Sequence, residues 1–347
     1  MSEVPTPRLP AEWERQRAVV FAFPRAAGDW AGNLEEVSEA LLAAIQQIHA
    51  VTPTYVLVSD RDWFAHYAER CPATVLYRPT NDTWMRDYGP ITRLEADGSP
   101  TLLDFTFNGW GGKFPAELDN AVPPTLREVF PDFGYRRIPE VLEGGAIESD
   151  GAGTILTTTT CLLSEGRNDY TTTGQAEAFL RPTLGADRFL WLHHGELIGD
   201  DTDAHIDTLV RFLDAETLAI QTCDDPTDPH YAPLRQMYAE CQAFRTHDGR
   251  PYHLIDLPWP GVVTSALDGR RLPATYANFL LSNGTLFLPQ YFGGAGADAG
   301  AREVLEQRTD YRIIGVDCQP FLEQHGSLHC MCMQIPEVSP HVRPSAV

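Results

Sequence analysis

The feature that most constrains the fold is a repeated change of periodicity along the chain. Short apolar stretches typical of buried strands alternate with stretches in which apolar residues recur every three or four positions, as on one face of a helix. The strand-like stretch 18–23 (AVVFAF) is followed by 33–50, where Val37, Leu41 and Ile45 lie on one stripe. This alternation recurs roughly five times, and it predicts a mixed α/β fold.

The same patterns predict the individual elements. Strands are expected at 18–23, 54–59, 91–94, 101–107, 154–160, 189–192, 207–213, 252–257, 285–289 and 312–316, and helices at 33–50, 62–70, 126–129, 234–244 and 301–307. Asn33 with Glu36 three residues later is typical of a capping box at a helix start. No low-complexity tract or Ser/Gly linker divides the chain, so residues 1–347 are expected to form a single domain.

Charge and composition limit the possible partners. The formal net charge of −22 disfavours nucleic acid and anionic membranes, which would repel the protein. The same charge suits a small cationic substrate. The amino terminus does not resemble a signal peptide, and no apolar run approaches the ~18 residues that span a bilayer. A cytoplasmic protein is therefore expected, with its seven scattered cysteines as free thiols.

Five stretches join sharp turns to ionisable or aromatic residues, a combination typical of functional loops. They are NDTWMRDYGP (81–90), FNGWGGKF (107–114), LEGGAIESDGAGTILTTTTCLL (142–163), GDDTDAHIDTLVRF (199–212) and SLHCMC (327–332).

His205 and Asp207 are separated by one residue. If they begin a strand, their side chains point to the same face. The segment 193–207 contains further histidines and aspartates, so a metal-dependent hydrolase is an alternative interpretation. The spacing of these residues, however, matches no standard zinc or calcium loop.

Cys330 and Cys332 form a C-x-C pair, which is a weak zinc signal without a second pair of cysteines. A disulfide between residues two apart would be strained. If 329 and 330 lie on a strand, His329 points away from Cys330.

Taken together, these residue types suit attack on a planar cation. A guanidinium group presents its N–H donors in a rigid fork, and two carboxylates can hold it from two sides. A thiolate can then add to the central carbon, if the cation and an imidazolium lower its pKa. The histidine can protonate departing ammonia and later activate water. This chemistry requires no metal and no organic cofactor.

The motifs W-x-R-D-x-G-P (84–90), E-G-G (143–145), H-x-D (205–207) and H-C (329–330) resemble, in this order, the signature of the agmatine deiminases. These belong to the guanidino-modifying enzymes that include bacterial peptidylarginine deiminases. The resemblance extends from about residue 21 to residue 336, nearly the whole chain. It implies the pentein fold, a five-bladed α/β propeller with its active site in the central channel.

The resemblance also implies a role for each matching residue. Asp87 and Asp207 would hold the guanidinium, and His205 would be the general acid and base. Cys330 would be the nucleophile, and Glu143 would orient His205 or keep it protonated. Trp84 and Trp110 correspond to aromatic positions near the substrate channel.

One position departs from the family pattern. Relatives usually carry threonine two residues after the nucleophile, where this chain has Cys332. A thiol is a weaker hydrogen-bonding group than a hydroxyl, so any bond that the threonine makes is in question here.

The resemblance implies hydrolysis of agmatine to N-carbamoylputrescine and ammonia, by a protein that forms a homodimer. Free arginine would require a cation for its α-carboxylate, which Lys113 or an arginine could supply. A peptidylarginine deiminase remains the nearest alternative, and an inactive polyamine-binding relative is a further one.

Overall fold

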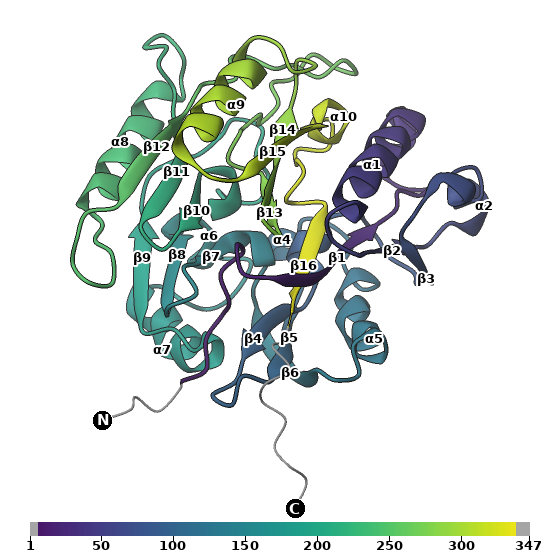
Figure 1. Cartoon of the computed structure of the whole chain (residues 1–347), viewed down its shortest axis with the longest axis horizontal. Coiled ribbons are helices and arrows are strands. Elements are labelled where there is room, and N and C mark those ends of the chain that lie inside the picture. The colour runs from purple at the N-terminus through teal and green to yellow at the C-terminus, as the bar shows by residue number, and fades with distance from the viewer. Residues whose placement is uncertain (1–5, 338–347) are drawn as a thin grey trace, which may run out of the picture.

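The computed structural model describes residues 6–337. Its strands form five small sheets, and in each of them an antiparallel pair is extended by a parallel strand. Figure 1 shows the sheets arranged around a common centre, with the longer helices outside them. The fold is therefore α/β, and its five repeated units are those of the pentein propeller.

The first sheet joins the two ends of the chain. Its strand order is β16 (Cys332–Pro336), β1 (Gln16–Ala22), β2 (Thr54–Val58) and β3 (Thr74–Tyr77). The antiparallel pairing of β1 with β16 closes the ring of blades. It also places the segment just before β16 at the centre of the molecule.

The other four sheets each use consecutive strands. They are β4 (Ile91–Leu94), β5 (Pro100–Thr106) and β6 (Gly134–Val141); β7 (Ile147–Ser149), β8 (Thr154–Thr158) and β9 (Arg188–Leu192); β10 (Val210–Asp214), β11 (Thr217–Gln221) and β12 (His253–Leu257); and β13 (Leu280–Ser282), β14 (Thr285–Gln290) and β15 (Arg312–Asp317).

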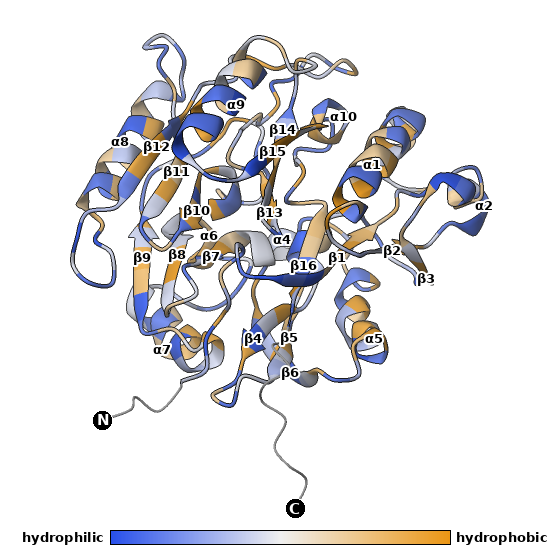
Figure 2. Cartoon of the chain, viewed as in Figure 1, coloured by the Kyte–Doolittle hydropathy of each residue, from blue (hydrophilic) through white to orange (hydrophobic). Residues whose placement is uncertain are grey.

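A long helix connects the two parallel strands of each blade. These helices are α1 (Leu34–His49), α5 (Val122–Val129), α7 (Thr173–Leu184), α8 (Tyr231–Ala243) and α9 (Ala297–Arg308). Right-handed crossovers of this kind bury one helix face against the sheet. Figure 2 shows mostly apolar residues on the strands and a mixture of apolar and polar residues on the helices. Among residues 6–337, no helix is both long and apolar enough to cross a bilayer.

Several local predictions need correction. The predicted capping box at Asn33 is wrong, because its side chain donates to the carbonyl of Pro320 and does not cap the helix. The predicted helix 62–70 is broken into α2 (Arg61–Phe64) and a short 3-10 helix. The predicted strand 207–213 begins only at Val210, because residues 206–208 form the 3-10 helix η5 (Ile206–Thr208).

The sequence patterns also missed six strands and one of the long helices. β3 and β6 are largely exposed, and the other four, β7, β11, β13 and β16, are only three to five residues long. The missed helix, α7, contains Pro182 and has only weak amphipathicity, but Thr172 and Gln175 form a capping box at its start. These elements are indicated by the strands they pair with and by their helix caps, whereas the spacing of apolar residues does not indicate them.

Candidate active site

Cys330 lies in a turn between α10 (Gln319–Leu322) and β16, at the centre of the propeller. The backbone N–H groups of His329 and Cys330 both donate to Oδ1 of Asn278, at 2.9 Å and 3.3 Å. The amide nitrogen of Asn278 lies 3.2 Å from the Cys330 sulfur. Asn278 therefore fixes the turn and contacts the thiol, although nothing in its sequence surroundings indicated a role.

The prediction that His329 and Cys330 lie on a strand is wrong, since β16 begins at Cys332. Within the turn, the two side chains do not point to opposite faces. Nδ1 of His329 lies 2.8 Å from Oδ2 of Asp207, which is also 3.8 Å from the Cys330 sulfur. His329 thus belongs to the surroundings of the site.

Asp87 is supplied by the short helix α3 (Met85–Tyr88), which follows Trp84. Its Oδ2 accepts a hydrogen bond of 2.9 Å from the indole of Trp110, and its Oδ1 accepts one of 3.0 Å from the backbone of Gly145. Burial raises the pKa of Asp87 to about 6, although nearby His205 acts in the opposite direction. Asp87 is therefore a carboxylate held in place by neutral donors.

Three of the predicted side chains converge on Gly145, the second glycine of the E-G-G motif. A Cβ atom at this position would lie 2.7 Å from Nδ1 of His205, 2.8 Å from Oδ1 of Asp87 and 3.2 Å from Oδ2 of Asp207. Such distances are shorter than van der Waals contact. Glycine is required here so that the imidazole and the two carboxylates can share one small space.

His205 precedes η5 and is fully buried. Its Nδ1 lies 3.6 Å from Oδ1 of Asp87, and its Nε2 lies 3.9 Å from Oε2 of Glu143. Burial lowers the pKa of His205, but the charge of Asp87, the Cys161 thiol and Glu143 outweigh it, so this pKa lies well above its usual value. The imidazole is thus protonated at neutral pH.

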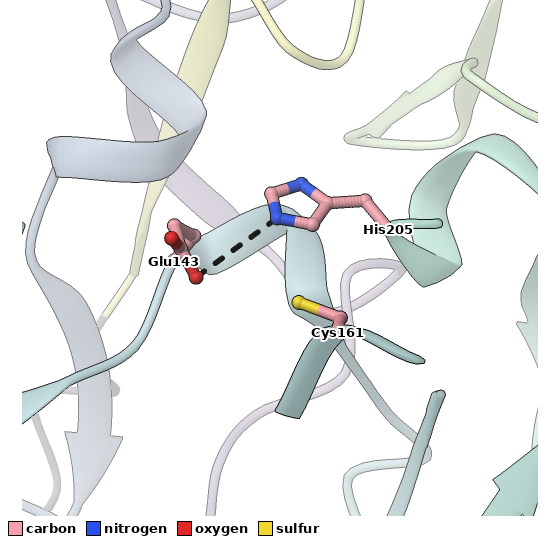
Figure 3. Close-up of side chains that lie close together, drawn as sticks. All are labelled: Glu143, Cys161 and His205. Carbon is pink, nitrogen blue, oxygen red and sulfur yellow. Dashed lines mark ion pairs between the residues drawn. The ribbon is translucent and has the colours of Figure 1, made fainter. Parts of the chain in front are cut away.

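Figure 3 shows the surroundings of the His205 ring, with Glu143 on one side and Cys161 on another. Cys161 lies in α6 (Thr159–Leu162), where the side chain of Thr158 caps its backbone N–H. From the sequence, Cys161 is predicted to be a free thiol with no further role. Its position within the motif-bearing stretch 142–163 is the only sequence signal that it lies near the site.

Glu143 is held by a buried guanidinium. Arg167 donates from Nε to both Glu143 oxygens at 2.9 Å, and its Nη1 lies 2.5 Å from Asp203. Lys113 is paired with the same aspartate at 2.8 Å. Within the described residues, Glu143, Cys161 and His205 are close enough to share a metal ion, but Arg167 already engages both oxygens of Glu143. A second cation there would be repelled.

The 193–207 residues suggested as a metal cluster do not gather in the structure. His194 lies on the surface and is paired with Glu240 at 2.7 Å, whereas His205 faces the buried site. Asp203 is engaged by Lys113 and Arg167.

The site opens into a cleft with about 480 Å³ of free space. Its lining includes Trp84, Trp110 and Cys330. Four further aspartates line it: Asp29, Asp82, Asp200 and Asp201. His325 is its only basic lining residue within the described part of the chain, and no lysine or arginine lines it.

Burial raises the pKa of the Cys330 thiol well above its usual value, and the charges of Asp207 and Asp87 act in the same direction. Burial also acts to raise the pKa of Asp207, but the hydrogen bond from His329 together with the charges of His329, His205 and Arg211 outweighs it and lowers this pKa overall. Before a cation is bound, the sulfur is therefore a protonated thiol between two carboxyl groups.

The model of the Porphyromonas-type peptidyl-arginine deiminase family matches residues 8–336 of the chain. The chain belongs to this family. The agmatine deiminase of Stutzerimonas stutzeri is 32% identical over 96% of this chain and 96% of its own. The substrate-bound agmatine deiminase of C. jejuni, a Cys-to-Ser variant, is 34% identical, covers 96% and 97%, and has a TM-score of 0.89.

Another solved member, provisionally named as a peptidyl-arginine deiminase, is 42% identical and covers 97% of this chain and 100% of its own, with a TM-score of 0.92. The family assignment thus agrees with the predicted resemblance. The names of these relatives include agmatine deiminase, arginine deiminase and peptidyl-arginine deiminase.

Proposed function

We propose that this protein hydrolyses agmatine to N-carbamoylputrescine and ammonia through a covalent intermediate on Cys330. The observation that carries the proposal is the convergence of four groups beside one acidic cleft. Asp87, Asp207 and His205 surround the space in front of Gly145, and the Cys330 sulfur lies 3.8 Å from Oδ2 of Asp207. Of these groups, Asp87 and Cys330 line the cleft.

In the first half of the reaction, Asp87 and Asp207 hold the guanidinium, whose forked donors match two carboxylates. The Cys330 sulfur adds to the central carbon as the thiol proton is released to solvent, because His205 already carries a proton. His205 gives its proton to the leaving nitrogen, the C–N bond breaks, and ammonia leaves. The product is a thiouronium cation bound to Cys330, so the net charge is conserved.

In the second half, a water molecule attacks the same carbon and loses its proton to His205. The C–S bond then breaks, which releases the ureido product and restores the thiol. One water is consumed, and one ammonium ion leaves in total. Glu143 supports both halves because its charge favours the protonated imidazole.

The substrate contributes to activation of the nucleophile. The negative charges of Asp87 and Asp207 hold the pKa of Cys330 high in the empty site. A guanidinium placed between these carboxylates neutralises them and adds a positive charge beside the sulfur. Thiolate formation is therefore coupled to binding of the correct cation.

The charges of the cleft favour agmatine over free arginine. Beyond the guanidinium position, the cleft presents the carboxylates of Asp29, Asp82 and Asp201. An ammonium group suits these neighbours, whereas an α-carboxylate would be repelled. The cation considered for arginine, Lys113, is already paired with Asp203.

A peptidylarginine substrate is the second candidate, and the name of the 42% identical relative favours it. Ammonia release and ureido product should be measured with agmatine, arginine and a blocked arginyl peptide. We expect the highest kcat/KM for agmatine. A higher kcat/KM for the peptide would contradict the choice of substrate but not the chemistry.

The mechanism uses no metal or organic cofactor, and this can be tested separately. We expect full activity after dialysis against EDTA. Loss of activity that returns with a stoichiometric metal ion would contradict the proposed cysteine mechanism and favour a metal-dependent hydrolase.

A further inference from the structure

His329 forms a buried bridge between two carboxylates. Its Nδ1 lies 2.8 Å from Oδ2 of Asp207, and its Nε2 lies 2.8 Å from Oε2 of Glu12. The histidine is 1% exposed, and both carboxylates are buried. Glu12, His329 and Asp207 thus form one line of polar contacts, although Glu12 and His329 are more than 300 positions apart in the sequence. This line ends at Asp207, which holds the guanidinium in the proposed function.

The two oxygens of Asp207 have different surroundings. Oδ2 is engaged by His329, whereas Oδ1 is buried and has no hydrogen-bond partner among the described residues. A carboxylate held at one oxygen by a ring N–H has its plane and direction set. Its other oxygen is then available to a ligand.

The far end of the line is fixed as well. Oε2 of Glu12 accepts a hydrogen bond of 2.7 Å from Arg211, and Oε1 accepts one of 2.7 Å from the backbone of Leu281. Arg211 also pairs with Glu148, and one of its nitrogens lies 3.1 Å from Nε2 of His329. The residues that hold Glu12 and His329 in place, Arg211, Glu148 and Leu281, therefore come from three different blades.

Glu12, Glu148 and His329 are close enough to share a metal ion, but Arg211 is fully buried among them. Its guanidinium already pairs with both carboxylates, so a metal ion would have to displace it. The arrangement is a support for Asp207 and not a cation site.

We propose that His329, anchored by Glu12, is a positioning residue that holds Asp207 ionised and correctly oriented for the guanidinium. This inference rests on the proposed function, in which Asp207 binds the substrate cation. Without His329, Asp207 would be a buried carboxyl beside the Cys330 thiol and near Asp87. Its neutral form would then be favoured, and a neutral carboxyl cannot neutralise a guanidinium.

Two substitutions separate positioning from packing. In His329→Asn, the side-chain amide can place an N–H near the former Nδ1, so contact with Asp207 is retained in part. In His329→Gln, the longer side chain extends toward Glu12 and does not match the Nδ1 position. We expect His329→Gln to lower kcat/KM for agmatine about 10- to 100-fold, the effect of one buried charge-assisted hydrogen bond. His329→Asn should lose clearly less.

The pH dependence gives a readout that a packing defect would not change. Titratable and charged groups face the Glu12–His329–Asp207 line at three places. Asp87, His205 and Cys330 lie at the Asp207 end, and Arg86 donates to the His329 carbonyl. At the other end, Glu12 is accompanied by Arg211 and Glu148. In the wild type, burial raises the pKa of Asp207, but the hydrogen bond and charge of His329, with the charges of His205 and Arg211, hold it below its usual value. In His329→Gln this pKa should rise, so the acid limb of kcat/KM should move to higher pH.

His49→Gln is the matched control, because His49 is a half-buried histidine in α1 whose Nδ1 contacts Thr54 at 2.9 Å, away from the cleft. The His49→Gln variant should keep the wild-type dependence of kcat/KM on pH. If His329→Gln fails to fold by circular dichroism, Glu12→Gln takes its place and should move the acid limb in the same direction. An unchanged limb in the folded variant would overturn the inference, as would equal losses in His329→Gln and His329→Asn.

The wild-type enzyme on agmatine separates this inference from the proposed function. If the wild type releases no ammonia from agmatine, the proposed function fails. If the wild type is active and His329→Gln retains its kcat/KM and pH profile, only the role of His329 is contradicted.

Discussion

Nδ1 of His205 lies 3.6 Å from Oδ1 of Asp87, and both groups are removed from solvent. A buried imidazolium and a buried carboxyl at this distance influence each other's protonation. Burial raises the pKa of Asp87, whereas the carboxylate raises that of His205. The pair therefore keeps an acid ready for the leaving group beside a carboxylate that binds the substrate.

This relationship predicts that kcat/KM for agmatine falls at low pH, which gives its pH profile an acid limb. Asp87 must be ionised to bind a guanidinium, and its pKa is raised to about 6. We expect kcat/KM for agmatine to fall below about pH 6, by up to about tenfold per pH unit. Asp82 also has a pKa of about 6, so Asp82→Asn serves as the control and should keep the limb. A profile that stays flat to pH 5 would contradict the assignment.

The two neighbouring cysteines should differ sharply. Cys330→Ser should reduce turnover more than about 1,000-fold, because a serine hydroxyl at this position lacks a base that could ionise it. Cys332→Ser should retain most of the activity, since the Cys332 sulfur lies 3.4 Å from the Leu328 carbonyl, which a serine hydroxyl can also contact. Ammonia release measures both variants. Equal losses would disprove the choice of nucleophile.

Gly145→Ala should remove activity by displacing the groups that converge there. The added methyl group would lie within 2.8 Å of His205 and Asp87, so these side chains must move. We expect kcat/KM to fall at least about 100-fold. Gly174→Ala in α7 is the control, because a Cβ there meets nothing within 4 Å, and it should be active and slightly stabilised. An active Gly145→Ala would show that the crowding is tolerated.

Arg167 should be required for stability as well as for activity. Its removal in Arg167→Ala leaves the carboxylate of Glu143 buried without its hydrogen-bonded guanidinium. We expect the free energy of unfolding to fall by about 3–5 kcal/mol, as for other broken buried pairs. Urea denaturation measures this change. Arg70→Ala breaks the exposed pair with Glu39 and should leave stability nearly unchanged. Similar values for the two variants would contradict a stabilising role for the buried pair.

Local patterns predicted those parts of the fold that depend on near neighbours. The strands at 54–58 and 91–94 bury apolar residues, and their sequence runs were recognised almost to the residue. β16 was missed because its position depends on pairing with β1, more than 300 residues earlier in the chain. The order of the blades likewise followed from the family resemblance and not from periodicity.

For the site, the sequence by itself determined which residue types were present and which motifs carried them: Asp87, Glu143, His205, Asp207 and Cys330. These side chains lie in turns and short helices, whose chemistry is local and therefore readable. Only the tertiary structure decided what surrounds them. Asn278 and Glu12 give no local signal, because each acts through a contact between blades. The same reason explains why His329, beside Cys330 in the chain, was predicted to face away yet lies against Asp207.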